Sequence, residues 1–266
     1  MNVSELIPFL ESIGASPKKA LSQNFLIDAN IVKKIVRMAE IQPGDEVLEI
    51  GPGPGALTSV LLDAGATVYA IEKDRLFASS LNRLQTTDGR LKVYSADALE
   101  FPLDQIPAKK VVANLPYHIT TPLLERMFTF GFSSLTLMVQ KEFAERLLGK
   151  PGTKEISSLT IFTQFYARLK DSFTVSSGCF YPKPKVDSAV IRLDKHPAPL
   201  KNPEPFFKLV RRAFQQRRKM LTSSLKEYYP VEKIKDALSA IPFRSDARPE
   251  MLSLEEWIAF FNEISG

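Results

Sequence analysis

Cysteine and histidine are both scarce in this sequence of 266 residues. It contains one cysteine, Cys179, and two histidines, His118 and His196. A single cysteine excludes an internal disulfide and is typical of a reducing compartment, so we expect a cytoplasmic protein. The same three residues do not make a zinc site, and no spacing of carboxylates suggests another metal. We therefore expect no bound metal.

Long apolar runs are absent as well. No stretch approaches the ~18 consecutive apolar residues that a membrane-spanning helix needs, so no membrane partner is expected. We also find no sequence signal for a subunit interface and expect a monomer.

Acidic residues are missing from one stretch near the C-terminal end. The net charge of the chain is +5. Between residues 205 and 226 there are basic residues but no acidic ones, namely Lys208, Arg211, Arg212, Arg217, Arg218, Lys219 and Lys226. Apolar residues at helical spacing place the first three of these on the opposite face of a helix. The stretch predicts a surface that binds the phosphates of a nucleic acid, with a merely solvated helix face as the alternative.

Short apolar runs alternate with helical patterns from about residue 28 to 140. We expect strands at 46–50, 67–71, 91–95, 110–113 and 135–139, with helices at 29–40, 56–64, 75–84 and 120–130. Asp28 is the expected N-cap of the first of these helices. This alternation is typical of a parallel sheet covered by helices on both faces.

The pattern changes after residue 150. We expect a helix at 158–167, then strands at 169–175 and 188–193 that are close enough in sequence to pair antiparallel. A proline-rich linker follows at 196–199, and the remainder lacks strand signals and ends in a helix near 254–264. The expected organisation is an α/β domain over 1–197, with a mostly parallel seven-stranded sheet, and a small helical domain over 198–266.

Three expected strands end in residues that suit a nucleoside ligand. The first is followed by GPGPGA at 51–56, and the second and third lead into Glu72 and Asp97. Read with Glu49, the glycine loop fits both a dinucleotide fingerprint and the S-adenosylmethionine loop of methyltransferases. A carboxylate such as Glu72 accepts hydrogen bonds from ribose hydroxyls in either case. The residues at these three strand ends leave the choice of cofactor open.

The fourth strand ends in NLPYHITTP at 114–122. Asn114 supplies a side-chain carbonyl, Leu115 a backbone carbonyl and Tyr117 a ring, while Pro116 restricts the backbone between them. Acceptors beside an aromatic face are suited to an aromatic amine that is being methylated. A dehydrogenase would instead need a proton donor, for which His118 is the only nearby candidate.

The ordered motifs of the chain resemble those of a known family. They are QNFLID (23–28), EIGPGPGALT (49–58), IEKD (71–74), DAL (97–99), NLPYHITTPLL (114–124), QKEFAERL (140–147), FYPKPKVDSAV (180–190) and FQQRRKML (214–221). This set is similar to the ribosomal RNA adenine N6,N6-dimethyltransferases, and most of all to their bacterial small-subunit branch. His118 departs from the asparagine that is frequent at its position.

The resemblance implies a Rossmann-like methyltransferase that uses S-adenosylmethionine. It further implies dimethylation of two adjacent adenosines in a 3′-terminal hairpin loop of small-subunit rRNA, within a pre-30S or 30S particle, and a role in small-subunit biogenesis. The implied cofactor-binding residues are Asn24, Leu26, Gly51, Glu72, Asp97 and Asn114. The implied catalytic residues are Asn114, Leu115, Pro116, Tyr117 and Phe180, with the two aromatic rings sandwiching the target base.

Three alternatives remain at this point. The first is a large-subunit dimethyltransferase of the erythromycin-resistance type, which shares the chemistry. The second is a non-catalytic ribosome assembly factor that retains the fold. The third is an NAD-dependent oxidoreductase, which only the glycine loop supports.

Overall fold

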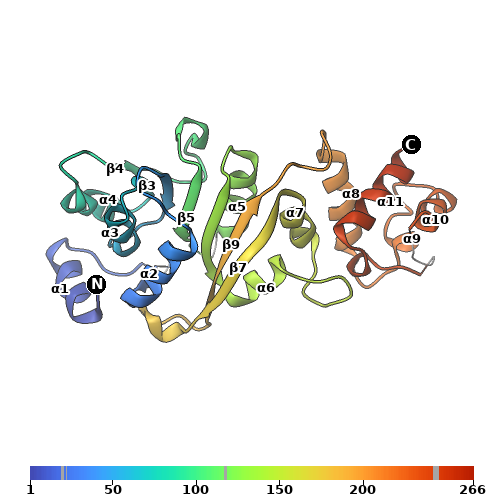
Figure 1. The fold of residues 1–266 in the computed structure, drawn as a ribbon. Helices are drawn as coiled ribbons and strands as arrows, with labels where there is room; N and C mark the ends of the chain where they lie inside the picture. Colours follow the sequence, from blue (N-terminus) through green and yellow to red (C-terminus); the bar gives the residue numbers. More distant parts are fainter. Residues whose placement is uncertain (19–20, 22, 117–118, 242–245) are drawn as a thin grey trace. The chain divides into compact units, whose positions relative to one another are not determined.

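The chain folds into two compact units, each with its own hydrophobic core. The computed structural model describes residues 1–18, 21, 23–116, 119–241 and 246–266 (Figure 1). Unit 1 comprises Met1–Ala144 and Leu169–Lys195, and unit 2 comprises Glu145–Arg168 and His196–Gly266. The expected boundary at residue 197 differs from this division for residues 145–168, which group with the C-terminal helices. The reason is aromatic packing, because the rings of Phe162 and Phe165 contact that of Phe207 at centroid distances of 4.9 and 4.8 Å.

Unit 1 is built on a seven-stranded sheet. The strands are β2 (Glu46–Ile50), β3 (Thr67–Glu72), β4 (Leu91–Ser95), β5 (Lys110–Asn114), β6 (Ser134–Gln140), β7 (Ala167–Val175) and β9 (Ser188–Lys195). Their order across the sheet is β4-β3-β2-β5-β6-β9-β7. The first five in this order pair parallel, and β9 pairs antiparallel with β6. The expected mostly parallel seven-stranded sheet is confirmed, as is the adjacency of the last two strands.

The helices of unit 1 include the four that the sequence pattern predicts. The helices of this unit are α1 (Val3–Ser12), α2 (Ala29–Met38), α3 (Ala56–Asp63), α4 (Arg75–Ser80), α5 (Thr120–Thr129) and α6 (Lys141–Leu147), the last of which crosses into unit 2. Helix α4 continues as a 3₁₀ turn at Leu81–Leu84. Asp28 is the N-cap of α2, since its carboxylate accepts from the N–H groups of Asn30 and Ile31 at 2.9 and 3.2 Å.

Helices α2 and α3 lie against the central strands with apolar faces. Their buried residues join those of β2, β3 and β6 in one cluster that includes Val36, Leu61, Val68 and Met138. A separate two-stranded sheet pairs β1 (Phe25–Leu26) antiparallel with β8 (Phe180–Tyr181). This pairing brings a segment near the N-terminus beside one that lies about 155 residues later in the chain.

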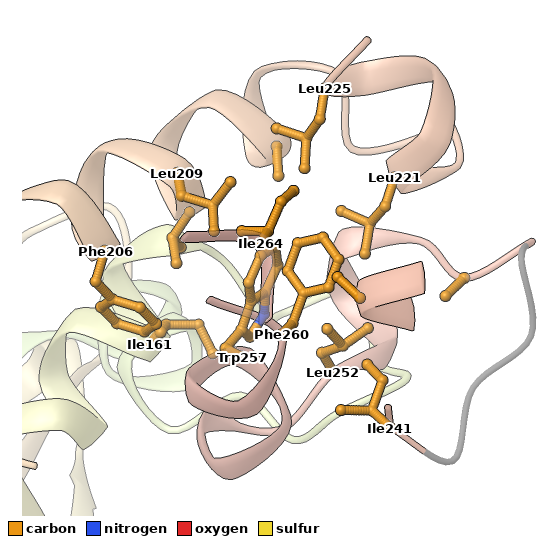
Figure 2. Packing of buried hydrophobic residues seen from close by; sticks show 14 of the residues in the cluster. Ile161, Phe206, Leu209, Leu221, Leu225, Ile241, Leu252, Trp257, Phe260 and Ile264 are labelled. Atoms are coloured by element: carbon orange, nitrogen blue, oxygen red, sulfur yellow. The ribbon is translucent and has the colours of Figure 1, made fainter. Parts of the chain in front are cut away.

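Unit 2 is helical apart from the start of β7. Its helices are α7 (Ser158–Tyr166), α8 (Glu204–Gln215), α9 (Leu221–Ser224), α10 (Val231–Ser239) and α11 (Leu254–Ser265). They surround a core in which Trp257, the single tryptophan, is fully buried beside Phe260 (Figure 2). Helix α8 turns Phe206, Leu209 and Val210 toward this core, as its apolar spacing predicts. No helix among the described residues is long and apolar enough to cross a membrane.

Candidate active site

A cavity of about 310 Å³ lies at the carboxyl ends of the central parallel strands. Parallel sheets of this kind bind ligands at that edge, beside the point where the strand order reverses, here between β2 and β5. The structure brings all of the predicted cofactor-binding residues to this cavity: Asn24, Leu26, Gly51, Glu72, Asp97 and Asn114. Leu115 and Pro116 also line it. Motifs far apart in the sequence therefore converge on one site.

The glycine loop after β2 requires a backbone that other residues rarely adopt. Gly51 has a φ of +68°, and Gly53 has a φ of +53° with the ring of Phe25 only 3.3 Å from where a Cβ would stand. The N–H of Gly51 donates to the Ile71 carbonyl at 2.9 Å. The N–H of Gly53 donates to Glu72 Oε2 at 3.0 Å. The loop is thus tied to the end of β3, and its glycines let a ligand approach the backbone closely.

Glu72 is held by backbone donors on both of its oxygens. Oε2 accepts from Gly53, and Oε1 accepts from the N–H of Asp74 at 2.8 Å. The side chain is buried, and this burial raises the pKa of Glu72 while the two backbone hydrogen bonds oppose the rise. Each carboxylate oxygen has a second lone pair, so the fixed group can still accept hydrogen bonds from ribose hydroxyls.

Glu49 is a second buried carboxyl group on the cavity wall, two residues before the glycine loop. Its Oε2 accepts a hydrogen bond from Thr58 Oγ1 at 2.7 Å on helix α3. Burial raises the pKa of Glu49 to about 8, and the negative charge of Glu72 adds to the rise. At neutral pH Glu49 is therefore mostly a neutral carboxylic acid, and this distinguishes it from the other acidic groups of the site.

Asp97 remains charged. Its Oδ2 pairs with Lys73 Nζ at 2.7 Å, and its Oδ1 accepts from the N–H of Leu99 at 2.9 Å. The hydrogen bond from Lys73 and that from Leu99 lower the pKa of Asp97. The carboxylate thus caps the turn that follows β4 and also lines the cavity. Because Lys73 is mostly exposed, its side chain can move when a ligand amine approaches Asp97.

Arg126 supports the Asp97 turn, although no sequence motif singled it out. From helix α5 its guanidinium donates to the carbonyls of Ala98 (2.9 Å), Leu99 and Phe101 (2.7 Å). These carbonyls belong to the turn whose amide groups already bond to Asp97. One arginine therefore fixes the loop that presents Asp97 to the cavity. A backbone carbonyl can accept a hydrogen bond whatever the side chain of its residue, so the sequence does not predict these contacts of Arg126.

The asparagine motif follows β5 as predicted. Asn114 Nδ2 donates to the carbonyl of Asn24 at 3.4 Å, which assigns the amide nitrogen to a protein partner. The N–H of Leu115 donates to the Met138 carbonyl at 3.1 Å. The carbonyl of Pro116 accepts from the start of helix α5. Tyr117 and His118 lie outside the described residues.

Phe180 is buried and does not line the cavity. It pairs with Leu26 across the β1–β8 sheet and is only 3% exposed. Leu26 lines the cavity, whereas Phe180 does not, and its ring packs in the core cluster with Met138 and Val190. The structure therefore places this predicted base-stacking residue next to the site but with its ring in the core.

An ion pair holds the segment that precedes the QNFL motif. Lys18 Nζ pairs with Asp74 Oδ2 at 2.7 Å, and Gln23 Nε2 donates to the same oxygen at 3.4 Å. Asp74 is almost fully buried at the end of β3, beside Glu72. Lys18 and Gln23 thus hold this segment against the residues that follow β3.

The predicted RNA-binding residues lie in unit 2, where their local contacts differ. Arg211 pairs with Glu204 at 2.8 Å, and Arg217 donates to the Lys154 carbonyl at 2.8 Å. Arg212 lies over the ring of Tyr228. The remaining three are exposed on α8 or after it, namely Lys208, Arg218 and Lys219.

The charge of the chain is distributed unevenly between the units. Unit 2 carries 16 lysines and arginines against 11 acidic residues, whereas unit 1 carries 19 of each. The whole net charge of +5 therefore belongs to unit 2, the unit that contains the basic segment. This distribution fits a polyanion-binding role for unit 2 better than the total charge alone does.

The residues around the cavity fit a nucleoside cofactor. Buried acceptors stand at the strand ends, the glycine loop leaves its backbone accessible, and the volume is in the range of small-molecule sites. Together with the strand order, this arrangement defines the Rossmann-like class of S-adenosylmethionine-dependent methyltransferases.

Comparison with known proteins identifies the family within this class. Residues 14–265 match the family described as ribosomal RNA adenine dimethylase, and the chain belongs to that family. A ribosomal RNA small subunit methyltransferase A from Protochlamydia amoebophila is 49% identical over 98% of this chain and 96% of its own length. The protein of the same name from Chlamydia trachomatis serovar L2 is 45% identical over 98% and 97%.

Solved structures agree with this assignment. A dimethyladenosine transferase from Plasmodium falciparum superposes with a TM-score of 0.76 at 28% identity, covering 91% of this chain and 98% of its own. The 23S rRNA methyltransferase ErmE superposes with a TM-score of 0.74 at 29% identity, covering 91% and 100%. A dimethyladenosine transferase and a 23S rRNA methyltransferase thus share this fold, and the fold alone does not identify the RNA substrate.

Proposed function

We propose that this enzyme dimethylates N6 of two adjacent adenosines in a 3′-terminal hairpin loop of small-subunit rRNA, with S-adenosylmethionine as methyl donor. The observation that carries the proposal is the convergence of the six predicted cofactor residues and of the asparagine motif on one cavity. We further propose that it acts as a monomer in the cytoplasm, on a pre-30S or 30S particle, during small-subunit biogenesis.

The relatives favour this substrate over the large-subunit alternative. Proteins named as small-subunit methyltransferases are 45–49% identical to the chain over nearly its whole length, whereas the 23S enzyme is 29% identical. The assembly-factor alternative is disfavoured because the acceptor groups expected for catalysis are in place around the cavity. The oxidoreductase alternative fails on family membership.

Asn114 and Leu115 are the proposed partners of the target amine. Because Asn114 Nδ2 donates to the Asn24 carbonyl, its Oδ1 is the end of the amide that can accept from N6–H. A second hydrogen bond from N6–H to the Leu115 carbonyl would favour a pyramidal nitrogen whose lone pair points at the methyl group. The monomethylated amine keeps one N6 proton for these acceptors, so the same pair serves both transfers.

The chain's residues then act by positioning. Bound S-adenosylmethionine would supply a methyl group that is already activated by a positively charged sulfur. Glu72 would hold the ribose, Asp97 the adenine amine, and Asn24, Leu26 and Gly51 the remaining contacts. Orientation of two reactants in this way supplies much of the rate enhancement, and no strong base is needed because the proton can leave after the methyl arrives.

The proposed base-stacking residues are Tyr117 and Phe180. Stacking on aromatic rings is worth about 1–3 kcal/mol per base, and this offsets part of the cost of extruding a loop adenosine. For Phe180 the proposal rests on the resemblance to the family, because the ring would have to turn out of the core cluster to reach a base.

Unit 2 is proposed to bind RNA through Lys208, Arg211, Arg212, Arg217, Arg218 and Lys219. Replacing Arg217, Arg218 and Lys219 with glutamate should weaken binding and flatten its salt dependence, by about 0.7–0.9 in logarithmic slope for each phosphate that the variant no longer neutralises. An unchanged slope would remove this segment from the RNA interface.

The function is tested by radiolabelled methyl transfer to unmethylated small subunits, with large subunits as the parallel substrate and nucleoside digestion of the product. Dimethyladenosine from small subunits alone is the expected result. The same product from large subunits alone would move the substrate to the other branch of the family. Retained cofactor binding without product on either subunit would favour the assembly-factor role.

A further inference from the structure

The contacts of the Arg212 side chain differ from those of Arg211 and Arg217 in the basic segment. Arg211 is neutralised by Glu204, and Arg217 donates to the Lys154 carbonyl. For Arg212, by contrast, the described part of the chain provides neither an acidic partner nor a hydrogen-bond acceptor. Its guanidinium instead lies over the ring of Tyr228, with 3.8 Å between Cζ and the ring centroid.

Tyr228 has an anchored backbone and a side chain that is exposed to solvent. It follows helix α9, and its N–H donates to the carbonyl of Leu225 at 2.9 Å. Leu225 is fully buried in the core of unit 2, which anchors the turn, while Tyr228 itself is 42% exposed. A guanidinium held against an aromatic face loses orientational freedom but keeps its N–H edge for another partner.

We propose that Arg212, oriented by Tyr228, is a recognition site for a phosphate group of the RNA substrate. The planar guanidinium can donate two parallel hydrogen bonds to phosphate oxygens, and restricting it beforehand reduces the entropy lost on binding. Lys208 lies one turn earlier on the exposed side of α8 and adds a second positive charge. Tyr228 is a positioning residue in this site. The inference rests on the proposed RNA-binding role of unit 2.

Matched lysine substitutions test the site without changing its charge. Arg212→Lys loses the planar fork, and Arg168→Lys makes the same exchange at an exposed arginine of unit 2 that is not among the proposed RNA-binding residues. The measurement is the Kd of the full chain for a labelled RNA hairpin with unpaired loop adenosines, over a series of salt concentrations. Arg212→Lys should weaken binding about tenfold, the scale of one charge-assisted hydrogen bond, with the salt slope unchanged. Arg168→Lys should leave Kd within about twofold of the native protein, because this arginine lies outside the proposed RNA-binding residues and the exchange keeps its charge.

Substitutions of Tyr228 test whether its ring orients the Arg212 guanidinium or only lies near it. Tyr228→Phe keeps the aromatic face and should bind as the native protein does, whereas Tyr228→Leu should weaken binding like Arg212→Lys. The double variant of Tyr228→Leu with Arg212→Lys should bind no more weakly than either single one, because both act on the same contact. Thermal unfolding followed by Trp257 fluorescence shows whether unit 2 is folded in each variant.

Two results would overturn the inference. One is an equal Kd for the two lysine variants, and the other is a fully additive double variant. The glutamate variant at 217–219 distinguishes this failure from failure of the proposed function. If that variant binds RNA weakly while Arg212→Lys binds normally, only the Arg212 site is refuted. If neither binds more weakly than the native protein, unit 2 loses its RNA-binding role and the inference falls with it.

Discussion

Glu49→Gln should remove a pH dependence from the stability of unit 1. The native carboxyl group is buried against Thr58, and its pKa of about 8 lies above the ordinary 4.5. Between these two values the folded protein binds a proton that the unfolded chain has released. The free energy of unfolding therefore falls as pH rises from about 4.5 to 8 and is constant above that range. Glutamine has nearly the same shape, still accepts from Thr58 and has no proton to lose.

The size of the effect follows from the span of pKa values. About 3.5 pH units at 1.36 kcal/mol each correspond to an upper limit of about 5 kcal/mol. Relaxation around the charged form reduces this, so we expect the stability difference between the native protein and Glu49→Gln to change by about 2–5 kcal/mol between pH 5 and 8.5. The raised pKa of Glu72 gives a pH dependence of the same sign. Because Glu72 is present in both proteins, its contribution largely cancels in the stability difference between them.

Urea unfolding at several pH values is the assay, and the choice of probe matters. Trp257 is the only tryptophan and lies in unit 2, so its fluorescence does not report on Glu49 directly. Far-ultraviolet circular dichroism follows both units. Parallel curves of unfolding free energy against pH for the two proteins would refute the assignment of a neutral carboxylic acid. Thr58→Val is a useful companion, because it removes a donor to the carboxylate and should move the transition to higher pH.

Three further substitutions address the site itself. Asn114→Ala should lower kcat by about 10²–10³-fold because the target amine then lacks one acceptor, with the circular dichroism spectrum unchanged; near-normal turnover would contradict the proposed role. Arg126→Lys keeps the charge but replaces the planar fork that reaches three carbonyls with a compact ammonium group, so calorimetry should show S-adenosylmethionine binding weakened about tenfold. Equal affinity would separate Arg126 from the cofactor site. Phe180→Leu should raise the KM for rRNA about fivefold or more if the ring stacks on the base. A loss of thermal stability with an unchanged KM would assign Phe180 to the core alone.

The sequence predicted the α/β architecture well because its signals are local. Apolar runs such as 46–50 and 91–95 are bounded by turn residues, and the structure begins and ends these two strands at the predicted residues. The cavity residues at the strand ends could also be predicted, because parallel strands bring their carboxyl ends to one edge of the sheet, whereas Asn24 and Leu26 followed only from the resemblance to the family. The motifs at 51–56 and 114–122 did not identify the cofactor by themselves. The family match identified it as S-adenosylmethionine.

Contacts between distant segments escaped prediction. Lys18 pairs with Asp74, which lies 56 residues later in the chain, and neither local sequence predicts this pair. Aromatic packing groups residues 145–168 with unit 2, whereas the sequence predicted them in the α/β domain. In each case the partner is chosen by tertiary packing, which spacing along the chain does not encode.

The uneven charge of the two units has a kinetic consequence. Electrostatic steering accelerates encounter with a polyanion and weakens as salt rises. Since unit 1 has no net charge, the proposed RNA-binding role of unit 2 implies that unit 2 guides the approach to RNA, whereas the cavity for methyl transfer lies in a unit without net charge. Added salt should therefore slow capture of the substrate but leave the turnover of captured substrate nearly constant. Capture and chemistry would then be adjustable separately, so that changing the surface of unit 2 alters which RNA is held without altering what is done to it.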